Sequence, residues 1–313
     1  MYASSEVYFV TTIWLVSSIG MLLFNKQAIN AMPQECILIA LQMSFTSFVL
    51  STFGRRHLYI GSVRDLRRWL MVVPFFPGML LTSIMSLKKL PLSLVIACRS
   101  LAPIVALSIE CLFPEPPVMG ATTAASVFVI LCGASLVATS LNAELLSGIS
   151  WAMLNNLFGV ADRLLQRLLL SQKEMAVDMS LSACTLLNNL CGILPMMIAA
   201  LVRDEIAELP MTMQHMTPAD IVCLCASCAV GLVICYTGLW AQSLISATSF
   251  MMLNNTSKVL VIFVDLSVSK QKILTRTQIF GALVTIAGAA LYGMQQVARK
   301  DQDAGEFGAE KKM

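Results

Sequence analysis

The sequence predicts an all-α polytopic membrane protein whose ten transmembrane helices form two inverted five-helix repeats. The chain is 57% hydrophobic and only 12% charged, with a mean hydropathy of +0.78, whereas a soluble domain carries about 25% charged residues. Its apolar residues gather in runs of about 20, the length that crosses a hydrocarbon core about 30 Å thick. Residues 93–138 are also echoed, in register, by residues 248–293.

The predicted spans occupy most of the chain, so no separate soluble catalytic domain is expected. In order, they cover residues 6–28, 34–53, 69–87, 92–113, 118–140, 147–170, 179–201, 219–242, 246–268 and 277–298.

The internal echo predicts two homologous halves, 1–141 and 142–298, followed by a tail at 299–313. Two halves with an odd number of helices lie inverted in the bilayer, as in many secondary transporters, which bind substrate where the repeats meet. Chance agreement between apolar sequences is the alternative. The matched residues are Pro103 with Lys258, Glu110 with Asp265, Gly133-Ala134 with Gly288-Ala289, Leu136 with Leu291, Trp14 with Trp151, Asn25 with Asp162, and Lys26 with Arg163.

The basic residues predict the orientation. Cytosolic loops of membrane proteins are enriched in Lys and Arg, and more than half of the 21 here lie on one predicted side, which includes the tail. Both termini are therefore expected in the cytosol. The net charge of +3 is too small to indicate a nucleic-acid partner. The residues on that side are Arg55, Arg56, Arg64, Arg67, Arg68, Arg163, Arg167, Lys173, Arg299, Lys300, Lys311 and Lys312.

Two basic residues lie well inside predicted spans, Arg99 in the fourth and Lys258 in the ninth. Intramembrane ionisable residues are costly and point to function. Two cations suit a phosphate-bearing substrate, because Arg can hold two phosphate oxygens and Lys acts as a point charge. Internal ion pairing with Glu110 or Asp265 is the alternative. Those two acids lie at the far ends of the same spans, where we expect gating or ion pairing.

Asparagine pairs occur in three spans. An amide offers both donors and acceptors, which suits a nucleobase edge or a sugar hydroxyl, while the alternative is hydrogen bonding between helices. The pairs are Asn155-Asn156, Asn188-Asn189 and Asn254-Asn255.

Other patterns predict packing rather than chemistry. Small residues in the fifth and tenth spans, such as Gly133 and Gly288, indicate close helix contact within one subunit or at a homodimer interface. Cys225 and Cys228 form a CxxC motif, but only two histidines occur in the chain, so small packing residues are favoured over a metal site. No HExxH, GxSxG or P-loop motif appears. We therefore expect neither an enzyme nor a cofactor.

These features resemble the drug/metabolite transporter superfamily, and more narrowly its nucleotide-sugar and triose-phosphate translocator branch. In the GDP-mannose transporters of this branch the seventh helix carries FYNN and the ninth GALNK. Here the corresponding segments read Leu186-Leu187-Asn188-Asn189 and Asn254-Asn255-Thr256-Ser257-Lys258. The fourth helix of these transporters has a basic residue followed eleven positions later by an acidic one, and Arg99 and Glu110 match this pattern. The triose-phosphate translocators show N-x-x-K-R on the ninth helix, where Val259 replaces the arginine.

The resemblance implies that Asn188 and Asn189 contact the nucleotide base. Asn254, Asn255, Ser257 and Lys258 would contact the sugar and phosphates. It implies a Golgi or ER membrane protein that exchanges a cytosolic nucleotide-sugar, a GDP-sugar among the candidates, for a luminal nucleoside monophosphate by alternating access. A sugar-phosphate or other organic phosphate exchanger and a transport-inactive membrane scaffold are the alternatives. The expected partners are this substrate and the lipid bilayer.

Overall fold

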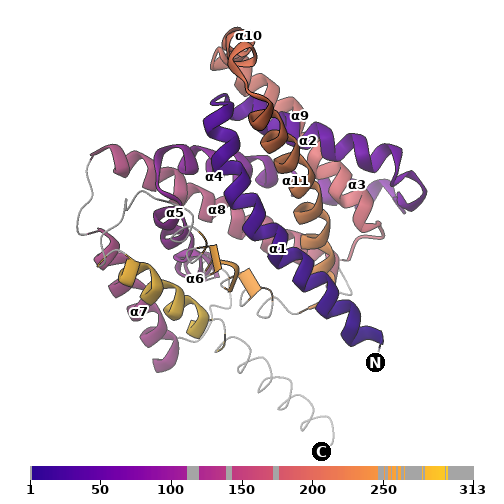
Figure 1. Ribbon diagram of the computed structural model, residues 1–313. Helices are drawn as coiled ribbons and strands as arrows, with labels where there is room; N and C mark the ends of the chain where they lie inside the picture. Colours follow the sequence, from indigo (N-terminus) through magenta and orange to yellow (C-terminus); the bar gives the residue numbers. More distant parts are fainter. Residues whose placement is uncertain are drawn as a thin grey trace, which may run out of the picture. The chain divides into compact units, whose positions relative to one another are not determined.

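The computed structural model is shown in Figure 1. It describes residues 2–110, 120–138, 143–171, 176–245, 250, 253–254, 256–258, 260–261, 264, 277, 279–292 and 294.

The described residues are predominantly helical. The labelled helices are α1 (Tyr2–Ala31), α2 (Glu35–Thr52), α3 (Val63–Leu70), α4 (Phe75–Lys89), α5 (Leu92–Arg99), α6 (Ala102–Glu110), α7 (Ala121–Ala138), α8 (Ala143–Ser171), α9 (Leu181–Val202), α10 (Glu205–His215) and α11 (Pro218–Leu244), with a short 3₁₀ turn at Arg55–His57.

Five stretches of the described chain are long and apolar enough to cross a membrane, and three shorter apolar helices overlap further predicted spans. The chain is therefore a polytopic all-α membrane protein, while the count of ten crossings stays a prediction. The long stretches are Ser5–Ala31, Glu35–Thr52, Val63–Lys89, Leu181–Val202 and Pro218–Leu244, and the shorter helices are Leu94–Val105, Ala121–Leu136 and Ile279–Tyr292.

Within the predicted span 92–113 the described helix is interrupted, since α5 ends at Arg99 and α6 begins at Ala102. Pro103 explains the break. A proline has no backbone N–H, so the carbonyl of Arg99 loses the donor that it would meet one helical turn later. The backbone instead tightens, with Leu101 N donating to Cys98 O at 3.1 Å and Ile104 N to Leu101 O at 2.9 Å.

The segment between the predicted spans 179–201 and 219–242 contains the helix α10. Glu205 and Glu208 lie in its first turn, where carboxylates favour the positive end of the helix dipole. Asp204 precedes them with φ +56°, a left-handed conformation that Asp tolerates better than most residues. The acidic residues therefore stabilise a helix start.

The chain divides into two compact units. Unit 1 comprises Met1–Leu92 and Asn142–Leu244, and unit 2 comprises Ser93–Leu141 and Ile245–Met313. Each unit takes one segment from each predicted half, and the segments correspond: the first three spans of each half fall in unit 1, and the last two in unit 2.

The helix pairs within unit 1 follow the same correspondence. Helix α1 packs against α11, α4 against α8, and α2 against α9, and α1 and α11 run side by side in Figure 1. In the order of the predicted spans these are the first with the eighth, the third with the sixth, and the second with the seventh. Exchanging the two halves converts the first pair into the second and leaves the third unchanged. This pattern supports the repeat.

Ion pairs join the helix ends at one end of unit 1. The Glu35 carboxylate lies 2.6 Å from Lys88 Nζ and 3.0 Å from Arg203 Nη2. Arg203 Nε also donates to Glu205 at 2.9 Å, whose other oxygen accepts from Cys36 N at 2.8 Å. Four elements, α2, α4, α9 and α10, are thereby held together.

At the other end of unit 1, an isolated antiparallel bridge pairs Ile60 with Met179. The Tyr59 hydroxyl donates to Asp178 Oδ2 at 2.9 Å, and this hydrogen bond, together with the charge of Asp178, raises the pKa of Tyr59. The bridge ties the α2–α3 connection to the segment before α9.

Candidate functional site

In unit 2, Lys258 lies against the break between α5 and α6. Its Nζ donates to the backbone carbonyl of Arg99 at 3.2 Å, and Lys258 is 6% exposed. The carbonyl that Pro103 leaves without its usual helical donor is therefore met by a lysine ammonium. Lys258 and Arg99, the two cations predicted from the sequence, are therefore in contact through the side chain of Lys258 and the backbone oxygen of Arg99.

This arrangement places a positive charge beside an irregular piece of backbone. In transporters, discontinuous helices mark substrate and ion sites, because unsatisfied backbone groups and helix ends face the ligand. A lysine offers three donors, and one of them meets the Arg99 carbonyl. Lys258 therefore caps the broken helix and places its positive charge there, and an ammonium group is chemically suited to bind a phosphate oxygen.

The neighbouring predicted residues in unit 2 are only partly described. Ser257 is buried, and its hydroxyl donates to Asn254 O at 2.8 Å within its own helix. Asn254 is half-buried. Asn255, Asp265 and the side chain of Glu110 lie outside the described residues, so their predicted roles stay predictions.

In unit 1, Asn188 and Asn189 are both buried in α9. The indole Nε1 of Trp69, on α3, donates to Asn188 Oδ1 at 2.9 Å. Asn189 Nδ2 donates to Thr185 O, one turn earlier, at 2.8 Å. The amide oxygen of Asn188 thus has a buried partner from another helix, whereas the amide nitrogen of Asn189 bonds within its own helix.

In the third asparagine pair, on α8, Asn155 makes a hydrogen bond between helices, which was the alternative to a role in substrate binding. Asn155 Nδ2 donates to Met79 O on α4 at 2.7 Å. It also lies 3.4 Å from Thr82 Oγ1. Asn155 therefore fastens α8 to α4.

Three further polar groups of unit 1 were not predicted as site residues: Gln42 and Asp162 are buried, and Lys26 is half-buried. Gln42 Nε2 donates to Asn25 Oδ1 at 2.8 Å and lies 3.3 Å from Ser227 Oγ, which links α2, α1 and α11. Lys26 Nζ donates to the carbonyls of Leu87 and, at 3.2 Å, Leu90, at the end of α4. Asp162 is the third. The repeat match of Asn25 with Asp162 and of Lys26 with Arg163 was the signal that could have identified them.

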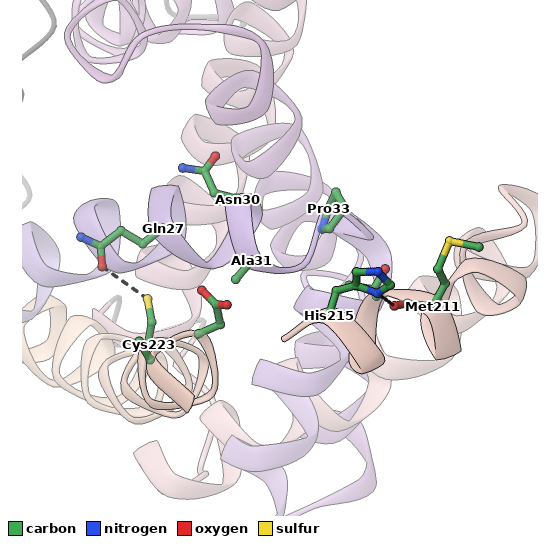
Figure 2. A pocket seen from close by; sticks show the side chains of 10 residues that line it. Gln27, Asn30, Ala31, Pro33, Met211, His215 and Cys223 are labelled. Carbon is green, nitrogen blue, oxygen red and sulfur yellow. Dashed lines mark hydrogen bonds between the residues drawn. The ribbon is translucent and has the colours of Figure 1, made fainter. Parts of the chain in front are cut away.

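A solvent-open cavity of about 680 Å³ lies at one end of unit 1, between α1, α10 and α11 (Figure 2). Its polar lining includes Gln27, Asn30 and His215. Figure 2 shows the Cys223 thiol directed at Gln27, 3.4 Å from its oxygen, and the His215 ring against the Met211 carbonyl at 2.9 Å. Every residue of this lining differs from the predicted substrate contacts.

The cysteines favour packing over metal binding. Cys228 is buried, Cys225 is exposed, and Cys223 is directed at Gln27. In the described part of the chain, no group of three His, Cys, Asp or Glu side chains is arranged to hold a metal ion.

The small residues of unit 2 serve a contact within the subunit. A Cβ atom built on Gly133 would lie 2.5 Å from the backbone nitrogen of Thr285, and one on Gly288 would lie 2.9 Å from the nitrogen of Ile130. Two glycines that match in the repeat therefore let α7 and the helix over Ile279–Tyr292 approach closely.

Comparison with known proteins agrees with this architecture. The model of the Triose-phosphate Transporter family matches residues 5–293. A solved crystal structure matches over 95% of this chain and 98% of its own, with a TM-score of 0.59 and 11% sequence identity, and this likeness concerns the fold alone. No curated protein matches the chain.

The family match covers nearly the whole chain, including both units and the Lys258 site. Members of this family move sugar phosphates or nucleotide sugars across membranes and are transporters rather than enzymes. The chain belongs to the triose-phosphate transporter family of the drug/metabolite transporter superfamily.

Proposed function

We propose that the protein is a secondary active antiporter, which brings a cytosolic nucleotide-sugar into the Golgi or ER lumen and returns a nucleoside monophosphate. The observation that carries the proposal is the buried ammonium of Lys258 at the proline-broken α5–α6 segment. A charge-assisted hydrogen bond to phosphate is stronger in such a low-dielectric setting than in water.

The residue roles follow from chemistry and from the family resemblance. Lys258 and Arg99 hold the phosphates, and Asn188 and Asn189 read the base. Asn254, Asn255 and Ser257 contact the sugar. For Asn188, the indole of Trp69 orients the amide so that its NH₂ group carries the recognition. Glu110 and Asp265 act as gating or ion-pair residues.

The proposed carrier works by alternating access of two inverted five-helix repeats, 1–141 and 142–298, with both termini and the tail 299–313 in the cytosol. The symmetric helix pairing in unit 1 and the matched glycines in unit 2 support the repeat. The excess of Lys and Arg in the predicted cytosolic loops supports the orientation.

Ligand-dependent thermal stability tests the substrate class. A ligand that binds only the folded state adds about 2.7 kcal/mol at a hundredfold excess over its dissociation constant. We expect one nucleoside monophosphate and its matching nucleotide-sugar to raise the melting temperature of the purified protein, with the guanine pair as the first to test. Stabilisation by nucleosides that lack phosphate, to the same extent, would contradict the phosphate role.

Substitution of Lys258 by glutamine makes this test specific. Glutamine can still donate to the Arg99 carbonyl, but it carries no charge. Hydrogen bonds to charged groups contribute about 1.5–3 kcal/mol, so Lys258→Gln should weaken nucleotide binding about 10- to 100-fold while the ligand-free protein stays folded. Lys89→Gln is the matched control, because Lys89 is exposed and bonds to Ser147. Equal affinities in all three proteins would refute the assignment.

A sugar-phosphate or organic phosphate exchanger is the second candidate. The description of the matching family and the N-x-x-K spacing from Asn255 to Lys258 favour it. It predicts stabilisation by triose phosphates and inorganic phosphate, with no preference for a nucleobase. A transport-inactive scaffold predicts no stabilisation by either class.

A further inference from the structure

A further ionisable group is buried in unit 1. Asp162 lies in α8, inside the predicted span 147–170, and is 3% exposed. Its Oδ1 accepts one hydrogen bond, from Gln166 Nε2 on the next turn, at 2.9 Å. Leu165, between them, packs against the apolar cluster around Trp69. The carboxyl group therefore lies among helices rather than at a helix end.

The charges around Asp162 do not neutralise it through an ion pair. Helices α3, α4 and α11 pack against α8. The Cys235 thiol of α11 and the neighbouring Arg163 interact with the carboxyl group electrostatically. Among the described residues, no ion pair joins it to Arg163 or to the charged residues of α3 and α4. Those residues are Arg64, Asp65, Arg67, Arg68, Lys88 and Lys89.

The position of Arg163 explains why, within the described part of the chain, it forms no ion pair with the carboxyl group. Adjacent helical residues point about 100° apart and do not face each other. A buried carboxylate without a close partner is costly, and a carboxyl group avoids that cost by holding a proton. The geometry around Asp162 suits the neutral acid, which has one O–H donor and retains acceptor capacity for Gln166.

The repeat offers an internal comparison. Asn25, the counterpart of Asp162, is 5% exposed and accepts from Gln42 at 2.8 Å. Both positions therefore accept a hydrogen bond from a glutamine amide. Asn25 does so without a titratable group, so packing and hydrogen bonding alone do not require a carboxyl group at 162.

Asp162 also lies close to a predicted substrate contact. Cys235 interacts electrostatically with Asp162 and also interacts with the side chain of Asn189. A change of charge at Asp162 can therefore reach the base-reading asparagine through one intervening side chain of the same unit.

We propose that Asp162 is a proton-binding site of the carrier. It holds a proton in the conformation described here and releases it to water when a conformational change hydrates α8: the O–H bond breaks, the carboxylate keeps the electron pair, and water accepts the proton. The consequence for transport rests on the proposed function. Asp162 takes a proton from cytosolic water as the nucleotide-sugar enters and releases it to luminal water before the monophosphate returns, so each exchange cycle moves one proton.

Infrared difference spectroscopy of the purified protein tests the site without any transport. At neutral pH the wild type should show the carbonyl stretching band of a protonated carboxyl, and Asp162→Asn should lose that band while staying folded. Asp178→Asn, which alters an exposed carboxylate, should keep it. An unchanged carboxyl band in Asp162→Asn would overturn the proposal.

Proteoliposomes with a trapped pH indicator test the coupling. The wild type should move protons during exchange of the nucleotide pair, and Asp162→Asn should exchange without proton movement. Exchange by the wild type with no proton flux would overturn the coupling. A third outcome separates the two proposals. If Asp162→Asn loses the infrared band but the wild type exchanges no phosphate compound, the proton site is supported and the proposed antiporter is contradicted.

Discussion

At the scale of single residues, the buried polar side chains do two kinds of work. Asn155 and Gln42 connect helices, and their amides meet specific partners. Lys258 meets the Arg99 carbonyl, which lacks its usual helical donor because Pro103 has no N–H. Pro103 and Lys258 also occupy matching positions of the repeat.

The Trp69–Asn188 bond yields a stability prediction. Trp69→Phe keeps an aromatic ring in the buried site but removes the indole N–H that donates to Asn188 Oδ1. An unsatisfied buried acceptor costs about 1–3 kcal/mol, so the variant should melt at a lower temperature in detergent.

A double variant separates this bond from ring packing. With Asn188→Leu as background, Trp69→Phe should cost clearly less, because no buried acceptor remains to be left unsatisfied. If the stability loss of the double variant equals the sum of the losses in the two single variants, the hydrogen bond contributes nothing.

At the scale of helices, the contact in unit 2 depends on the absence of side chains. Gly133 of α7 and Gly288 of the facing helix each lie where a Cβ atom would meet partner backbone within 3 Å. In a membrane, helix association relies on this close packing, since the lipid itself is apolar. From the sequence alone, these small residues could serve either a contact within one subunit or a dimer interface. The close contact in unit 2 accounts for them within one subunit.

Glycine-to-alanine substitutions test this contact. Gly133→Ala and Gly288→Ala should each destabilise the protein by about 1–3 kcal/mol, the usual cost of overpacking. Gly231→Ala is the matched control in α11, since its Cβ would lie 3.6 Å from the flexible end of Met21.

Thermal unfolding in detergent reads out all three glycine variants. If Gly133→Ala and Gly288→Ala have the same melting temperature as Gly231→Ala, the close approach of the two helices does not stabilise the protein.

At the scale of the whole molecule, apolar runs predict most of the helices. A chain segment in lipid must satisfy its backbone N–H and C=O groups with hydrogen bonds inside the protein, and a helix does so within the segment. They do not predict the break after Arg99, which a single proline causes within an apolar stretch. They also miss α10, whose acidic first turn is as typical of a loop as of a helix start. The partners of Asn188 and Asp162 come from other turns and helices, so their roles emerge only in the folded chain.

The correspondence between halves is the clearest large-scale feature. The three helix pairs of unit 1 and the glycine contact of unit 2 are each compatible with exchange of the halves. This internal symmetry, together with the family match over residues 5–293, underlies the proposal of an alternating-access carrier.

Exchange in proteoliposomes tests the central claim most directly. Purified protein is reconstituted into liposomes that contain either a nucleoside monophosphate or buffer alone, and entry of the matching labelled nucleotide-sugar is measured. The proposal predicts rapid entry only into the preloaded liposomes, with Lys258→Gln strongly reduced and Lys89→Gln unchanged. Equal entry with and without preloading, or entry that is insensitive to Lys258→Gln, would contradict it.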